Sequence, residues 1–359
     1  MQRNPMPPTP AADPAARNGG RSWGRSWGRA ALFVAALAVV VWAASHASAV
    51  GASWSRAGHL IAGLGWGWLL LLGVVWFLGL WVHTVVLTAS LPGLTHRRAL
   101  TLNLSGSAVS NVLPLGGLAG TTLNLGMIRG WGHSNLDFAR FVIVSKATDL
   151  VAKLTMPLVA VVALLLWGVA PGGHGGWWLA AAAVAAAAGS LVVAALLGRA
   201  TPLLHLVAAA ERVRDRIGRR ASAPRTTWTA AVTDLLDGTD RLVRRRWARL
   251  SWGMAAYWLL QGALLWYCCI AVGLHLSVPV VFAALVAERA LTLLAITPGG
   301  AGLVEAGTIG VLIALGVDPT AALAAVLLFR AFVFAAEIPV GGLATGLWLA
   351  SRRTSRRVA

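Results

Sequence analysis

The chain alternates between long apolar runs and short polar stretches. An apolar run of about 20 residues is long enough to cross a bilayer as a helix. By this rule we expect six spans, at residues 30–48, 66–89, 141–169, 177–198, 250–274 and 321–349. Tryptophan residues stand near several of the expected ends, as is typical of a membrane–water interface. The pattern therefore predicts an all-α polytopic membrane protein built as a helical bundle.

Two further apolar stretches, residues 99–127 and 280–317, are interrupted by proline and glycine. The first contains Asn111-Val-Leu-Pro114-Leu-Gly116-Gly117, and the second contains Thr297-Pro298-Gly299-Gly300-Ala301-Gly302-Leu-Val-Glu305. Proline removes a backbone donor, and glycine permits a tight reversal. A bare break in hydrocarbon would leave backbone groups unpaired, so such breaks occur inside protein or beside a water-filled cavity. We interpret both stretches as re-entrant hairpins; the alternative is two ordinary spans with Pro/Gly kinks.

Arginine is distributed unevenly, and its distribution predicts the orientation. The 359 residues include 30 Lys+Arg and 12 Asp+Glu, which gives a net charge of +18. Arginines are concentrated in segments 1–29, 199–249 and 351–359, which the positive-inside rule places in the cytoplasm. With both termini cytoplasmic, hairpin 99–127 enters and leaves on the cytoplasmic side, and hairpin 280–317 does so on the outer side. This is an inverted-repeat arrangement, in which a binding site is expected near the midplane.

These boundaries divide the chain into three parts. Residues 1–29 are rich in Pro, Gly, Arg and Ser, a composition that predicts a disordered basic cytoplasmic tail. Residues 30–350 form the transmembrane domain, and residues 351–359 a basic cytoplasmic tail. The loop 199–249 inside the domain has helical spacing, and we expect it to lie as a basic helical hairpin on anionic headgroups. A cleaved signal peptide is the alternative for span 30–48, but the long basic region before it favours an uncleaved helix.

The composition excludes several classes of function. Only 12% of the residues are charged and 58% are hydrophobic, whereas soluble domains carry about 25% charged residues. The positive charge therefore indicates a membrane surface as the partner, and no nucleic acid. Cys268 and Cys269 are adjacent in an apolar run, which provides neither a disulfide framework nor a zinc site. No phosphate-binding loop, serine-hydrolase, zinc-protease or EF-hand pattern is present, so we expect no metal, no cofactor and no enzymatic activity.

Several ionisable residues fall inside the expected membrane segments, where charge is costly and usually faces a cavity or a partner. Lys146, Asp149 and Lys153 share one helix face, and Asp149 is within reach of both lysines. Further charged residues cluster around the second break and on the last helix: Glu288, Arg289, Glu305, Arg330 and Glu337. Ion pairs that only hold helices together are the alternative, but the clustering at the broken segments favours a cavity.

Together, the breaks and the charges predict one substrate-binding site. We expect it to be formed by Asn111, Pro114, Gly116, Gly117, Lys146, Asp149, Lys153, Glu288, Arg289, Pro298, Gly299, Gly300, Gly302, Glu305, Arg330 and Glu337.

At these positions the chain resembles the flippase-like transmembrane domain of bacterial lysylphosphatidylglycerol synthases and its stand-alone relatives. The two Pro/Gly motifs, Asp149, the Gly316-Val317 turn and Arg330 carry the resemblance, which covers most of residues 30–350. It implies a bundle with two re-entrant segments that transfers lipid between the leaflets of the bacterial plasma membrane. The synthase proper would also need a large soluble acyltransferase-like domain. Because the sequence stops at Ala359, we do not expect synthase activity.

The chain departs from the family pattern at two places. Thr121 and Asn124 stand where the family usually has Glu and Arg, and Ser145-Lys146 replaces a Glu-Arg pair before Asp149. Fewer acids and two lysines favour a phosphate-bearing or neutral lipid over a cationic aminoacyl lipid. The sequence thus predicts movement of an anionic phospholipid or lipid-linked molecule between leaflets. A membrane-embedded transferase acting on a lipid-linked substrate and an ion-coupled small-solute transporter are the alternatives.

Overall fold

The computed structural model describes residues 51–113, 116–167, 188, 228–294 and 298–358. Within these ranges every regular element is helical and no strand is present, so the predicted all-α class is confirmed. The longer helices are α2 (Trp54–Ala62), α3 (Trp66–Ser90), α4 (His96–Val112), α5 (Gly116–Gly130), α6 (Asn135–Leu166), α9 (Trp228–Ala271), α10 (Val278–Leu291), α11 (Leu303–Ala314), α12 (Pro319–Arg330) and α13 (Glu337–Val358). Helix α2, on the segment before the second span, was not expected from the sequence.

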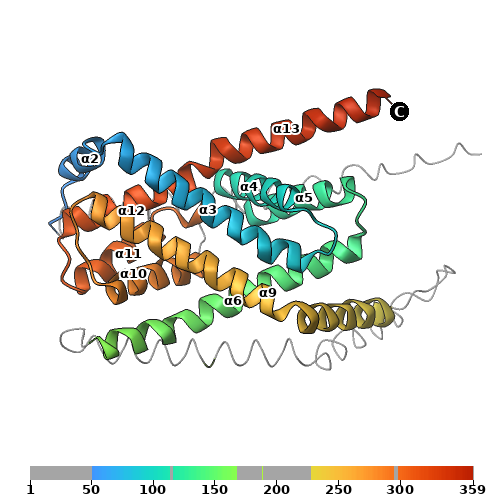
Figure 1. Ribbon diagram of the computed structural model, residues 1–359, viewed down its shortest axis with the longest axis horizontal. Coiled ribbons are helices and arrows are strands. Elements are labelled where there is room, and N and C mark those ends of the chain that lie inside the picture. Colours follow the sequence, from blue (N-terminus) through green and yellow to red (C-terminus); the bar gives the residue numbers. More distant parts are fainter. Residues whose placement is uncertain (1–50, 114–115, 168–187, 189–227, 295–297, 359) are drawn as a thin grey trace, which may run out of the picture.

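Four described segments are long and apolar enough to cross a membrane: Trp66–Ser90, Asn135–Leu164, Val232–Ala271 and Pro319–Arg352. They correspond to the predicted spans 66–89, 141–169, 250–274 and 321–349. The other two predicted spans, 30–48 and 177–198, lie outside the described residues apart from residue 188, as does the tail 1–29. The four segments run along the long axis of the molecule (Figure 1).

Helix α3 shows why these segments suit a membrane. Leu72 and Leu80 are buried, while Leu70 and Val74 on the same helix are 69% and 64% exposed. A helix that is apolar on all sides is typical of a membrane span, because lipid covers the face that packing leaves open. The buried side packs mainly against α9, and the shared core includes Leu72 and Trp258.

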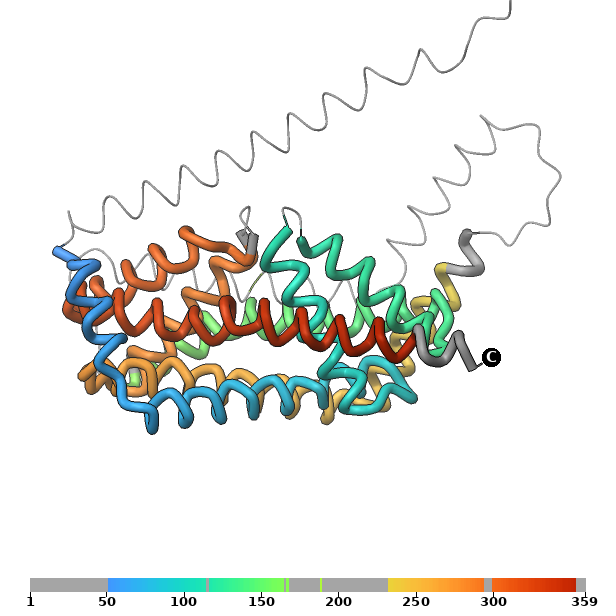
Figure 2. Tube along the Cα trace, turned by 90° about the horizontal axis from the view of Figure 1, so that it is seen from above, coloured from blue at the N-terminus to red at the C-terminus, as the bar shows by residue number. Residues whose placement is uncertain are grey.

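The two broken segments form helical hairpins. Helices α4 and α5 pack against each other, and so do α10 and α11. The α4–α5 hairpin begins and ends where α3 finishes and α6 starts, whereas the α10–α11 hairpin begins and ends at the opposite end of the bundle (Figure 1). The described helix ends that flank the two breaks lie near each other in the middle of the molecule (Figure 2), where α4 contacts the short 3-10 turn η4 (Pro298–Gly300). Entry of either hairpin from a membrane surface stays a prediction.

Helix α9 differs from the expected basic loop. The sequence predicts a surface helix within 199–249 and a separate span that starts at residue 250. In the structure Trp228–Ala271 is one continuous helix. The arginines between residues 241 and 249 therefore lie on the same helix as the predicted span, directly before it. The reason is local, because the segment contains no proline and only isolated glycines, and nothing stops the helix. Residues 199–227 lie outside the described part.

The last helical segment is interrupted at one point. Between α12 and α13 lies a π-helical turn, η5 (Ala331–Ala335), in which the Ala336 N–H donates to the Ala331 carbonyl over 2.8 Å. Pro339 follows closely and has no N–H to donate to the preceding turn. Such π-turns are frequent at functional sites, and this one lies beside the meeting point of the two hairpins.

Candidate functional site

A cavity of about 260 Å³ lies between the two hairpins where their breaks meet. Most of its lining side chains are polar or charged, although the surrounding helices are apolar. The lining residues are Asn103, Ser107, Asn111, Lys153, Tyr257, Gln261, Glu288, Arg289, Thr292, Gly299, Arg330, Val333, Phe334 and Glu337. Polar groups inside a membrane domain are expensive to maintain, so this concentration marks a candidate binding site.

Arg330 organises the second break. Its Nε lies 2.6 Å from Glu305 Oε1, its Nη2 donates to the Gly299 carbonyl over 2.8 Å, and its Nη1 lies 3.5 Å from Glu288 Oε1. The Arg330 side chain is only 8% exposed. One guanidinium therefore joins α12 to α10, to the break itself and to α11. Its five fixed donors suit such a multiple contact.

Glycine is required in this break for two reasons. Gly299, Gly300 and Gly302 have φ values of 58°, 72° and 87°, a region that other residues avoid because Cβ approaches the following carbonyl. A Cβ at Gly299 would also overlap the Phe334 ring. The resulting turn exposes the Gly299 carbonyl to Arg330, and the Gly302 N–H donates to Glu305 Oε2 over 2.6 Å.

Glu288 and Arg289 form the charged wall contributed by α10. Arg289 Nε lies 2.9 Å from Glu288 Oε2, and the Glu288 side chain is 1% exposed. The Arg289 guanidinium also lies over the Trp258 ring, 5.5 Å from its centroid, at a distance suited to a cation–π interaction. Glu288 is thus shared between two arginines, which compensates its burial.

Several buried side-chain atoms of the cavity residues make no hydrogen bond within the described part of the chain, and those of Glu288 and Arg289 Nε take part in ion pairs instead. Arg289 Nη2 and Gln261 Oε1 are buried, and neither has a hydrogen bond among the described residues. The Gln261 amide is held by its Nε2, which donates to the Tyr257 hydroxyl over 2.9 Å. A buried unsatisfied donor or acceptor costs about 1–3 kcal/mol. Both residues line the cavity, so a polar ligand that reached these two atoms would supply the missing hydrogen bonds.

The first hairpin contributes neutral polar groups. Asn103, Ser107 and Asn111 are four residues apart on α4, so they share one helix face. Asn111 Nδ2 donates to the Phe334 carbonyl over 3.3 Å, which ties this hairpin to the π-turn of the last helical segment. The two halves of the molecule therefore meet at Asn111.

Helix α6 brings one of the two lysines to the site. Lys153 lines the cavity, and its Nζ lies 2.9 Å from Asp149 Oδ2. Asp149 itself does not line the cavity, and this ion pair connects it to Lys153. Lys146 is exposed and does not line the cavity. The structure thus separates two lysines that the sequence groups on one face.

The residues of the predicted site differ in how they relate to the cavity. Asn111, Lys153, Glu288, Arg289, Gly299, Arg330 and Glu337 line the cavity, and Glu305 and Gly302 brace the break behind it. Gly300 is buried in the same turn, which begins at Pro298. Gly116 is buried against the Ser110 backbone and Gly117 is exposed, so neither lines the cavity, and Pro114 lies outside the described residues.

Seven lining residues were not anticipated: Asn103, Ser107, Tyr257, Gln261, Thr292, Val333 and Phe334. For some of them the sequence contains a usable signal. Gln261 interrupts an apolar span, which is itself unusual. The spacing of Asn103, Ser107 and Asn111 also marks a polar face. Val333 and Phe334 carry no such signal, because only the packing of the π-turn places them at the cavity.

Comparison with known proteins gives one family. No curated protein matches the chain. The family model described as the lysylphosphatidylglycerol synthase TM region matches residues 28–341, which include both hairpins and every residue that lines the cavity. The chain therefore belongs to the lysylphosphatidylglycerol synthase transmembrane-region family.

Proposed function

We propose that this integral membrane protein moves a phosphate-bearing lipid between the leaflets of the bacterial plasma membrane. The observation that carries the proposal is the polar, charged cavity between two opposed hairpins of an otherwise apolar bundle. A charged headgroup crosses hydrocarbon slowly because its desolvation is costly. A polar cavity at this depth lowers that cost. In the topology predicted from the sequence the hairpins enter from opposite membrane surfaces, an inverted-repeat arrangement that would suit alternating access.

The size of the cavity favours a headgroup as the occupant. Its volume of about 260 Å³ is slightly below the range of roughly 300–1,000 Å³ that is typical of sites enclosing a whole drug-sized ligand. A lipid would therefore insert only its headgroup, while its acyl chains stay in the apolar surroundings.

An arginine donor, and not the net charge of the cavity, favours phosphate over a cationic headgroup, since the Glu337 carboxylate also lines the cavity. The Glu288 and Glu305 carboxylates are already engaged by Arg289 and Arg330. The free donor is the guanidinium Nη2 of Arg289, and Arg–phosphate contacts are among the strong charge-assisted hydrogen bonds. The free acceptor, Gln261 Oε1, suits a hydroxyl group on the same headgroup.

The test is transbilayer movement in reconstituted vesicles that contain a fluorescent phosphatidylglycerol. Arg289→Gln is expected to slow movement at least about tenfold, the effect of losing roughly 1.4 kcal/mol of interaction. Arg289→Lys keeps the charge and should restore part of the rate. Arg244→Gln is the control, because Arg244 is 80% exposed, pairs with Asp240 of the same helix and does not line the cavity.

Three outcomes would overturn the proposal. A folded Arg289→Gln variant that moves lipid at the wild-type rate would show that the cavity takes no part in lipid movement. Conversion of the labelled lipid into a new species, detected by chromatography, would instead identify a transferase. Uptake of a small solute without lipid movement would identify a transporter.

A further inference from the structure

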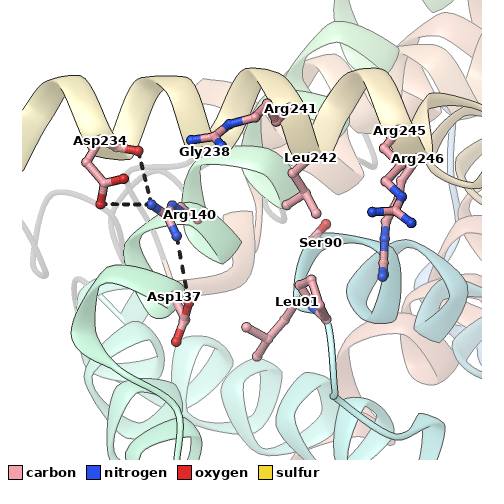
Figure 3. A pocket seen from close by; sticks show the side chains of 11 residues that line it. Ser90, Leu91, Asp137, Arg140, Asp234, Gly238, Arg241, Leu242, Arg245 and Arg246 are labelled. Atoms are coloured by element: carbon pink, nitrogen blue, oxygen red, sulfur yellow. Dashed lines mark hydrogen bonds and ion pairs between the residues drawn. The ribbon is translucent and has the colours of Figure 1, made fainter.

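A second, larger cavity lies away from the first, beside the N-terminal part of α9. Its volume is about 480 Å³, and four of its lining residues are arginines: Arg140 of α6, and Arg241, Arg245 and Arg246 of α9. Its floor is the end of α3, at Ser90 and Leu91 (Figure 3). None of these residues belongs to the site between the hairpins.

The acids of this cavity are already engaged by one arginine. Arg140 Nη2 lies 3.1 Å from Asp234 Oδ2 and donates to the Asp234 carbonyl over 3.0 Å, and Arg140 Nη1 lies 4.0 Å from Asp137 (Figure 3). Gly238 makes this possible, because a Cβ there would overlap the Arg140 guanidinium. Arg140 and the two aspartates therefore form a local group that closes one side of the cavity.

The three arginines of α9 have no carboxylate partner among the described residues. Arg241 Nε donates to the Asp237 carbonyl over 3.2 Å, and Arg246 Nη1 donates to the Thr88 carbonyl near the end of α3 over 3.1 Å. These bonds orient two guanidiniums without neutralising them. Arg245 stands beside Arg246 on the same helix (Figure 3). The cavity thus holds three uncompensated positive charges around a partly apolar floor.

The cavity also lies at the basic end of the bundle. Arg97 and Arg98 begin α4 there, Arg129 ends α5, and Arg352 of α13 lies against Gly130. By the positive-inside rule this end faces the cytoplasm, where anionic lipid headgroups lie. A basic pocket at this depth meets phosphates, which guanidinium groups bind through paired hydrogen bonds.

We propose that this cavity is a binding site for the phosphate of an anionic lipid headgroup, held by Arg241, Arg245 and Arg246. The lipid would join α3 to α9 at the membrane surface, because Arg246 also binds the end of α3. The proposal is independent of lipid movement through the central cavity, since the two sites share no residue.

The test compares two double variants that remove the same charge from the same helix. The first double variant, Arg241→Gln with Arg245→Gln, removes two guanidinium groups that line the cavity. The second, Arg244→Gln with Arg249→Gln, removes two exposed arginines that do not line it. Binding of dioleoyl-phosphatidylglycerol to purified protein is measured by native mass spectrometry, with dioleoyl-phosphatidylcholine as the uncharged comparison. We expect the first variant to weaken phosphatidylglycerol binding roughly tenfold or more, and the second less than about threefold.

Equal weakening in both double variants would overturn the site, since it would reveal only a general surface charge. A thermal shift produced by inorganic phosphate without anionic lipid, and lost in the first variant, would overturn the assignment to a lipid. Circular dichroism checks that both variants fold. Neither double variant changes a residue of the central cavity. Lipid movement can therefore be measured in the same variants, and its result is separate from that of the binding experiment.

Discussion

The two helical hairpins share a Pro/Gly break but are held by different interactions. Residues 99–128, which contain most of the α4–α5 hairpin, include no charged side chain. There the Ser110 hydroxyl donates to the Gly116 carbonyl over 3.0 Å, and Gly116 and Gly120 let α5 approach the α4 backbone closely. In the α10–α11 hairpin, Glu288 and Glu305 meet Arg330 instead.

This difference gives the two hairpins different sensitivities. Small residues allow close packing of helices in membranes, where burial of apolar side chains supplies little driving force. The first hairpin should therefore tolerate a change of polarity better than an increase in size. The second hairpin depends on charge balance, because a buried charge without its partner is strongly destabilising. At the cavity, the first presents amides and a hydroxyl, whereas α10 of the second presents the Glu288 carboxylate and the Arg289 guanidinium.

The largest expected effect is that of Glu288→Gln in the second hairpin. The change leaves Arg289 without a carboxylate and removes one of the two carboxylates near Arg330. Breaking a buried ion pair from one side costs about 3–5 kcal/mol, and we expect a loss of that order in unfolding free energy, measured in detergent. Asp240→Asn removes an exposed pair with Arg244 and should cost less than about 1 kcal/mol. Similar losses in both variants would show that charge does not hold this hairpin.

A smaller effect is expected from Gly116→Ala in the first hairpin. The added Cβ would overlap the Ser110 backbone, and overpacking of this kind typically costs about 1–3 kcal/mol. Gly117→Ala is the matched control, because a Cβ there meets nothing within 4 Å and alanine favours a helix over glycine by about 1 kcal/mol. The two neighbouring changes should therefore have opposite signs in thermal unfolding. A stabilising Gly116→Ala would contradict the close approach of α4 and α5.

The smallest effect on stability is expected from Lys153→Gln. Its pair with Asp149 is partly exposed, at 14% and 32%, so its loss should cost no more than about 1 kcal/mol. Lipid movement in vesicles should nevertheless slow several-fold, because Lys153 lines the cavity. Lys146→Gln serves as the control and should leave the rate unchanged. If Lys153→Gln lowers the melting temperature but not the rate, the lysine has only a structural role.

The sequence predicted the four described spans and the positions of the two helical breaks because both depend on local properties. Run length decides whether a helix can cross a bilayer, and a proline followed closely by several glycines favours a break, whereas Pro157 alone stays inside α6. The cost of burying charge also identified Glu288, Arg289 and Arg330 in advance. Neutral cavity residues such as Ser107 and Tyr257 were missed, since serine and tyrosine occur in ordinary spans without a functional reason.

Tertiary structure decided which of the candidate residues meet. Lys146 and Lys153 lie on one face of α6, and the sequence treats them alike. Seven residues of helix separate them by about 10 Å along its axis, and only Lys153 reaches the level at which the two breaks meet. Gly116 and Gly299 likewise belong to similar Pro/Gly motifs. Gly116 is buried between two helices, whereas Gly299 lines the cavity. The periodicity of the sequence determines which face of a helix a residue lies on. Whether that residue meets a partner depends on its position along the helix axis, and this is decided by how distant segments pack.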